Sequence, residues 1–139
     1  MSLISLSEDR PSPTGVYESR YPDGTLRERC AYKDYKWEGL FERWHPNGQL
    51  SERSSYKGGL LDGLSEWWLD NGQISIRRTY KRGKLDGLYE EWYDNGQLKF
   101  RVECRCGRPH GLFQEWYATG ELKSSVMCNN GELEKQWRR

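Results

Sequence analysis

The sequence of 139 residues lacks any long apolar run and any excess of charge of one sign. No stretch approaches the roughly 18 apolar residues that a membrane-spanning helix needs. The 22 Lys and Arg residues almost balance the 21 Asp and Glu residues, so the net charge is only +1. Such a chain has no overall field that would attract nucleic acid or anionic lipid. The mean hydropathy of -1.04 also argues against a large globular core.

Signals for export and for metal binding are lacking as well. Residues 1–14 show no basic start followed by an apolar stretch, which predicts a flexible leader and not a signal peptide. Without such a signal, the four cysteines indicate a reduced, cytoplasmic protein. Cys104 and Cys106 form a C-x-C pair with no second pair at zinc-finger spacing. We therefore expect plain strand and turn positions for them and no metal site.

Residue sets that carry catalysis are scarce. The two histidines, His45 and His110, are far apart in sequence, and there is no P-loop, dinucleotide-binding glycine pattern or Ser-His-Asp order. Carboxylates are abundant, but Asp62 and Asp86 recur at a fixed interval, as do several glutamates. Recurrence points to structure, whereas a catalytic pair would stand apart. The sequence predicts no enzyme activity and no cofactor.

Aromatic residues, in contrast, are plentiful, with seven Trp and nine Tyr. Disordered chains are poor in aromatics, so the low hydropathy does not indicate disorder. A thin fold that half-buries amphipathic aromatic side chains accounts for both properties.

A period of 24 residues runs through the chain. Turn dipeptides recur at this interval from Asp23-Gly24 to Thr119-Gly120, and so do tryptophans from Trp44 to Trp116. The repeat predicts a leader at 1–14 and one domain at 15–139, divided into units 15–38, 39–62, 63–86, 87–110 and 111–134. A partial sixth unit covers 135–139, where Trp137 takes the place of an aromatic residue of the full units.

Each unit has the pattern of a β-hairpin, two alternating runs around an Asn-Gly or Asp-Gly turn. One hairpin is marginal alone, but stacked units share a continuous core. The predicted fold is therefore all-β, an elongated twisted antiparallel meander of about five stacked 24-residue hairpins with ten or eleven strands.

Two turn types give two registers. A type I turn with a bulged glycine suits Pro22 and Pro46 and places Trp92 opposite Leu98. That register puts Leu88, Trp92, Leu98, Phe100 and Val102 on one face, and each unit's first aromatic opposite its arginine. A type I′ turn instead places glutamates opposite the arginines, for example Glu90 opposite Arg101. We favour the bulged turn, and both registers remain open from sequence.

The repeated pattern, Gly-Leu-x-Glu-x-Trp-x-x-Asn-Gly-Gln-Leu followed by Tyr-Lys-x-Gly-Lys-Leu-Asp-Gly, resembles the bacterial variant of the MORN (membrane occupation and recognition nexus) repeat. Units two to four carry it most fully, and Arg20 and Thr119 depart from it in the end units. The resemblance implies stacked hairpins and protein–protein binding, including antitoxin-like neutralisation of a toxin. It also implies, as the alternative, a membrane-associated or assembly scaffold of the classical MORN type.

Candidate binding residues are aromatic or arginine side chains, the types enriched at interface hot spots. Trp67 is singled out because its equivalents Arg43, Glu91 and Glu115 are not aromatic, and we expect it on an otherwise polar face. The other candidates are Tyr17, Phe41, Tyr89, Phe113, Arg29, Arg53, Arg77 and Arg101.

The sequence thus predicts a non-enzymatic, protein-binding repeat scaffold. The partner is a protein, such as a cognate toxin, while nucleic acid is disfavoured and a membrane is the weaker alternative. The two open edges of the meander offer a route to oligomerisation.

Overall fold

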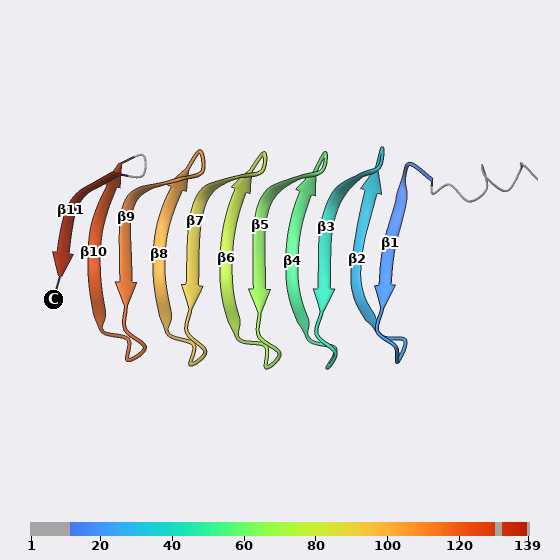
Figure 1. Ribbon diagram of the computed structural model, residues 1–139, viewed down its shortest axis with the longest axis horizontal. Helices are drawn as coiled ribbons and strands as arrows, with labels where there is room; N and C mark the ends of the chain where they lie inside the picture. The colour runs from blue at the N-terminus through green and yellow to red at the C-terminus, as the bar shows by residue number, and fades with distance from the viewer. Residues whose placement is uncertain (1–11, 130–131, 139) are drawn as a thin grey trace, which may run out of the picture.

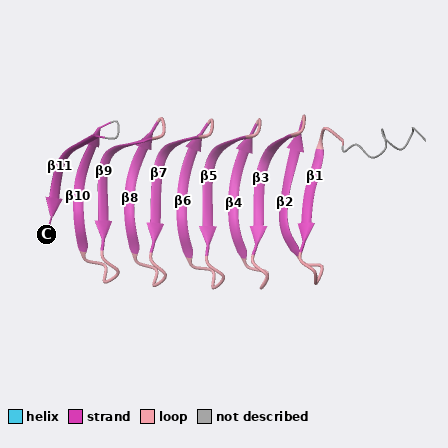
Figure 2. Cartoon of the chain, viewed as in Figure 1, coloured by secondary structure: helices cyan, strands magenta, loops and turns pink. Residues whose placement is uncertain are grey.

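The structure, a computed structural model, describes residues 12–129 and 132–138, and the side chains of the former range. It is one antiparallel sheet of eleven strands in which every strand pairs with its sequence neighbours (Figure 1). Strands joined by short turns make up almost all of the described chain (Figure 2). The strands are β1 (Gly15–Arg20), β2 (Leu26–Lys33), β3 (Lys36–Trp44), β4 (Leu50–Lys57), β5 (Leu60–Trp68), β6 (Ile74–Lys81), β7 (Lys84–Trp92), β8 (Leu98–Arg105), β9 (Arg108–Trp116), β10 (Leu122–Asn129) and β11 (Glu132–Arg138).

These findings confirm the predicted fold class. Of the predicted leader, residues 1–11 lie outside the described part of the chain, and Pro13 accepts a backbone hydrogen bond of 2.9 Å from Tyr35. Trp137 lies in β11, but its side chain is outside the described set. No helix long and apolar enough to span a membrane occurs among the described residues.

The hairpin tips are type I turns with a bulged glycine, as favoured from sequence. In the first tip, the Gly24 N–H donates to the Tyr21 carbonyl at 2.9 Å, and Gly24 has φ 93°. Proline fits the first central position of this turn because its φ is fixed near -65°. The other four tips repeat the bond, with glycines at 48, 72, 96 and 120.

The type I′ turn is found at the opposite end of the sheet, where consecutive units are linked. Both central residues of the first four linking turns have positive φ, as in Arg82 (51°) and Gly83 (82°). The first linking turn puts Asp34 and Tyr35 into this conformation without any glycine. The next three linking turns bond back to the unit before them, and in the first of these the Gly59 N–H donates to the Trp37 carbonyl at 2.9 Å.

A second bulge beyond each tip reconciles the two registers. Trp92 faces Leu98, as the type I turn requires, yet the next pair is Glu91 with Phe100, so Lys99 is the extra residue. Beyond this bulge Glu90 faces Arg101 and Tyr89 faces Val102. The prediction that Phe100 and Val102 share a face with Trp92 is therefore wrong, as is the pairing of each first aromatic with its own arginine.

Because directly paired residues share a face and neighbours along a strand alternate, the register divides the side chains into two sets. One set contains every buried hydrophobic residue among those described, and we call its side of the sheet the packed face; it holds Cys30, Phe41, Val102, Cys104, Val126 and Cys128. The other side, the open face, carries Trp92, Leu98 and the Glu90–Arg101 pair. A single-layer sheet thus has its core along one face only.

Candidate partner-binding surfaces

Trp67 lies on the packed face, beneath the guanidinium group of Arg78. The Cζ atom of Arg78 is 5.3 Å from the centroid of the Trp67 ring and 4.7 Å from that of Tyr89. Arg78 also donates to the Tyr89 hydroxyl at 2.9 Å, and that hydroxyl donates to Glu91 at 3.0 Å. Trp67 is half-buried, so the expectation of an exposed tryptophan on a polar face is wrong.

The unusual residues at this point compensate for one another. Ser65 is fully buried and directly faces Arg78, where neighbouring units pair Tyr89 with Val102. A small residue in place of the aromatic leaves room for the long arginine side chain, and Trp67 then covers it. The structure shows one packing unit, in which the cation–π contacts are satisfied within the chain.

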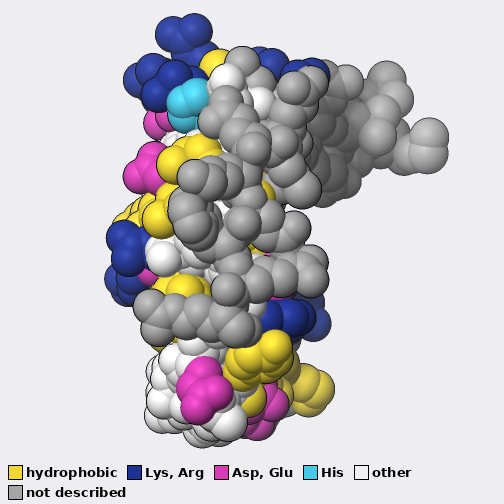
Figure 3. Space-filling view, turned by 90° about the vertical axis from the view of Figure 1, so that its left-hand side faces the viewer, with side chains coloured by type: hydrophobic (Ala, Val, Ile, Leu, Met, Phe, Trp, Pro, Cys, Tyr) yellow, Lys and Arg dark blue, Asp and Glu magenta, His cyan; other side chains and the backbone are white. Residues whose placement is uncertain are grey.

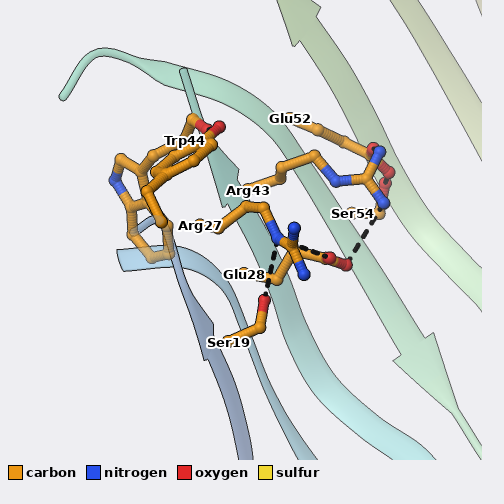
Figure 4. Close-up of polar contacts among 8 residues, drawn as sticks. Ser19, Arg27, Glu28, Arg43, Trp44, Glu52 and Ser54 are labelled. Atoms are coloured by element: carbon orange, nitrogen blue, oxygen red, sulfur yellow. Dashed lines mark hydrogen bonds and ion pairs between the residues drawn. The ribbon is translucent and has the colours of Figure 1, made fainter. Parts of the chain in front are cut away.

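Arg43 occupies the position equivalent to Trp67 one unit earlier and makes ion pairs instead (Figure 4). Its guanidinium group lies 3.2 Å from Glu28 and 3.5 Å from Glu52. Glu52 also accepts a hydrogen bond of 3.1 Å from the buried hydroxyl of Ser54. In Figure 4, Trp44 points away from this cluster, on the opposite side of β3.

Burial on the packed face shifts the pKa values of its titratable groups. Burial raises the pKa of the Cys30 and Cys104 thiols, because the thiolate loses hydration. The pKa of the Tyr89 hydroxyl is raised chiefly by burial, an effect that the Arg78 hydrogen bond opposes. Thiols with raised pKa values are poor nucleophiles at neutral pH. These two thiols are therefore weakly reactive at neutral pH.

The four candidate arginines lie on the open face, in a row that crosses the sheet. The row alternates acid and base, and Arg77 is paired with Glu66 at 3.0 Å and Glu90 at 3.8 Å. Arg53 and Arg29 both reach Glu42, at 3.4 and 3.7 Å. We call this row the charge ladder; it comprises Glu18, Arg29, Glu42, Arg53, Glu66, Arg77, Glu90 and Arg101.

The predicted site residues are thus divided between the two faces. Tyr17, Phe41, Tyr89, Phe113 and Trp67 belong to the packed face. The arginines belong to the ladder, four positive charges balanced by four carboxylates. The structure does not bring the two sets together into one surface.

The sequence analysis missed an exposed apolar row beside the ladder. One aliphatic residue per unit lies on the open face, directly after the glycine that begins the unit. Four of them are 61%, 53%, 43% and 41% exposed, namely Val16, Leu40, Leu64 and Leu112. Leu88 completes this row, which we call the leucine row, and is half-buried. The signal was present as a strict 24-residue recurrence, but we had assigned Leu88 to the core.

The two ends of the strands differ in charge. Eight exposed cations lie in the linking turns and form what we call the basic rim: Lys33, Lys36, Lys57, Lys81, Arg82, Lys84, Arg105 and Arg108. Within the described part of the chain none of the eight has an ion-pair partner. Figure 3 shows Lys and Arg side chains gathered at its top, the end at which the linking turns lie.

The hairpin tips form the opposite end and carry no lysine or arginine. Their charged residues are Asp23, Asp70, Asp94 and Glu121, all exposed. Several tips are joined to the next unit, as where the Tyr93 hydroxyl donates to the Trp116 carbonyl at 2.8 Å. His45 occupies the equivalent of Tyr93, and its Nε2 lies 2.8 Å from the Trp68 carbonyl. This contact gives His45 a structural role.

A hollow of about 750 Å³ lies beside the first linking turn. Tyr17, Tyr32 and Trp37 contribute rings to its lining, together with Tyr35. The rings of Tyr17 and Trp37 are 5.6 Å apart at an interplanar angle of 58°. The hollow is lined by aromatic rings, with Glu18 and Lys36 as its charged lining residues.

No group of three His, Cys, Asp or Glu side chains able to hold a metal ion occurs among the described residues. No curated protein matches the chain. The MORN repeat variant model matches five segments, 13–34, 37–57, 61–82, 85–103 and 109–127, which together exceed half of the sequence. These segments coincide with the stacked hairpins, and the chain belongs to the MORN repeat variant family.

Proposed function

We propose that this chain is a non-enzymatic, cytoplasmic scaffold that binds a partner protein through its sheet, and that it acts as an antitoxin or immunity-type protein by covering the partner's active surface. The observation that carries the proposal is the leucine row. Four of the five units expose an aliphatic side chain at the same place on the sheet, although burying it would stabilise the fold. Contiguous exposed apolar surface rimmed by polar residues is typical of interaction sites.

The charge ladder supports this proposal because its four positive and four negative charges cancel. Three of its four arginines, Arg29, Arg53 and Arg77, pair with glutamates within the sheet, so the open face does not depend on a partner for charge balance. A partner that covers the leucine row gains apolar burial without leaving these ion pairs unpaired. The hairpin scaffold is fixed by its own backbone ladder and loses little freedom on binding.

The antitoxin role is tested by co-expression with the protein encoded by the adjacent gene. We expect the neighbouring protein to arrest growth alone and the present chain to restore it. The double variant Leu64→Asp/Leu88→Asp should fail to restore growth, whereas Tyr117→Ser, at an exposed tip, should restore it fully. A neighbour that has no effect on growth would contradict the antitoxin role.

The unpaired basic rim favours a second candidate, a membrane-associated or assembly scaffold. Exposed lysines near a surface contribute about 1 kcal/mol each to binding of anionic lipid. Flotation with vesicles containing phosphatidylserine at physiological salt distinguishes the two functions. Binding that is lost in Lys57→Glu/Lys81→Glu and retained in Leu64→Asp would favour this second function over the first.

A further inference from the structure

The leucine row has a spacing that identifies a class of partner. Strands lie 4.7–4.9 Å apart, so residues two strands apart, such as Leu40 and Leu64, are separated by about 10 Å. Seven residues of an α-helix rise about 10.5 Å, at 1.5 Å per residue. A helix that presents an apolar residue at every seventh position therefore matches the spacing of the row over two or three units. Beyond that length the twist of the sheet turns the row away from the helix axis.

The residues between the leucines make room for such a helix. Leu40 pairs with Ser55 and Leu64 pairs with Thr79, so a small side chain follows each of these two leucines across the sheet. Glu103 follows Leu88, and Met127 follows Leu112. From Leu40 to Leu88 the row therefore alternates protrusions with hollows. Apolar side chains at intermediate helix positions, three or four residues from each contact, can enter those hollows, as in other complexes in which an amphipathic helix binds through one face.

The charges on the two sides of the row are unequal. Toward the tips lies the charge ladder, whose four glutamates and four arginines cancel. Toward the linking turns lies the basic rim, which is about 13 Å away because Lys36 and Leu40 are four positions apart along the strand. A helix on the row is about 10–12 Å across with its side chains, so one of its flanks comes within reach of the lysine ammonium groups.

Carboxylates near the linking turns do not cancel the rim. Glu38 accepts a hydrogen bond of 3.0 Å from the Gly58 N–H, and Asp86 accepts one of 3.4 Å from the Cys106 N–H, so both are engaged by backbone. Even with Glu38, Asp62, Asp86, Asp34 and Glu103 counted, the eight cations exceed the five carboxylates and leave a net charge of +3 among the described side chains at this end.

We propose that the open face binds an amphipathic α-helix of the partner protein, with apolar residues at heptad spacing on the leucine row and acidic residues along the flank nearest the basic rim. The proposal rests on the proposed function as a protein-binding scaffold and names the element that this scaffold recognises. It places the binding surface away from Trp67 and the aromatic residues of the packed face.

The test uses two labelled 22-residue helical peptides with leucines at heptad a and d positions. One peptide carries glutamates along a single flank, and the other has lysine at each of those positions. Fluorescence anisotropy should show binding of the glutamate peptide, weakened about tenfold or more by Leu64→Asp, a loss of about 1.4 kcal/mol. Lys57→Glu/Lys81→Glu should weaken the glutamate peptide and strengthen the lysine peptide.

The controls are Tyr117→Ser, an exposed apolar position at a tip, and Lys99→Glu, a cation outside the rim. Both should bind the glutamate peptide as the unaltered chain does. Circular dichroism establishes that each variant is folded, and Leu112→Asp provides a second position should Leu64→Asp unfold. Equal binding of the two peptides, or full binding by both leucine variants, would overturn the proposal.

Absence of peptide binding together with binding to phosphatidylserine vesicles would also overturn it and would favour lipid as the ligand of the rim. These outcomes are distinguishable from failure of the proposed function. Growth rescue that depends on Leu64 and Leu88 without peptide binding would keep the protein-binding scaffold and reject the helical partner.

Discussion

The packed face and the open face differ in how the recurrence of a residue type along the sequence relates to the burial of its side chain. Across the packed face one buried position changes from unit to unit, from Cys30 to Ser54 and on to Val102 and Val126. On the open face an aliphatic residue recurs in every unit, as leucine in four of the five, and most of these side chains are exposed, as at Leu40 and Leu64. In this repeat protein the recurring aliphatic residues of the open face lie largely at the surface, whereas the buried position of the packed face changes because facing residues compensate in size.

The largest expected effect compares two adjacent residues of β3. Phe41 is 7% exposed on the packed face, whereas Leu40 points to the open face. Phe41→Ala should lower the free energy of unfolding by about 3–5 kcal/mol, the usual cost of removing a buried phenylalanine side chain. Leu40→Ala should cost less than about 1 kcal/mol, since most of its side chain already contacts water. Urea denaturation measures both, and equal losses would contradict the division into faces.

Much of the division into two faces could be predicted from the sequence. The 24-residue period and the turn dipeptides predicted the meander, and proline at 22 and 46 predicted the type I turn. The second bulge was not predictable, because no glycine or proline marks it; its extra residues include Lys99 and Ser51. One unrecognised extra residue exchanges the faces of every residue beyond it. That shift moved Phe100 and Val102 to the wrong face in our prediction.

The candidate site was predictable only in part. The arginines of the ladder were correctly set opposite glutamates in the alternative register. Trp67 was chosen because it breaks the repeat, but only coordinates reveal that Ser65 and Arg78 break it at the same place. The leucine row recurred plainly in the sequence. Recurrent leucine is usually core, and burial cannot be read from recurrence alone.

A smaller effect is expected in the charge ladder of the open face. Arg77 lies between Glu66 and Glu90, and Glu90 is buried. Arg77→Met should cost about 1–3 kcal/mol, because it leaves a buried carboxylate without its ion pair. Arg53→Met removes an arginine that pairs with Glu42 and should cost no more than about 1 kcal/mol. Similar losses in urea denaturation would show that burial does not distinguish the two positions.

The smallest expected effect on stability appears at alkaline pH and comes from buried thiols of the packed face. Burial raises the pKa of Cys30 and Cys104 in the folded state. Their contribution is therefore complete below the unfolded thiol pKa of about 8.5 and is lost as pH rises through the higher folded values. The urea midpoint should fall between pH 7 and pH 10. In Cys30→Ala/Cys104→Ala that fall should be smaller, and an unchanged fall would exclude the thiols as its cause.

Thiol labelling tests most directly the central claim, that one layer of strands has a buried face and an open binding face. In a Cys106→Ser background, which removes the exposed native thiol, Leu64→Cys and Ser65→Cys place a thiol at adjacent positions of β5. We predict that the thiol at position 64 reacts with iodoacetamide nearly as fast in the folded as in the unfolded protein. The thiol at 65 should react more than about 100-fold more slowly, because its labelling requires the sheet to open. Equal rates at the two positions, or faster labelling at 65, would contradict the account.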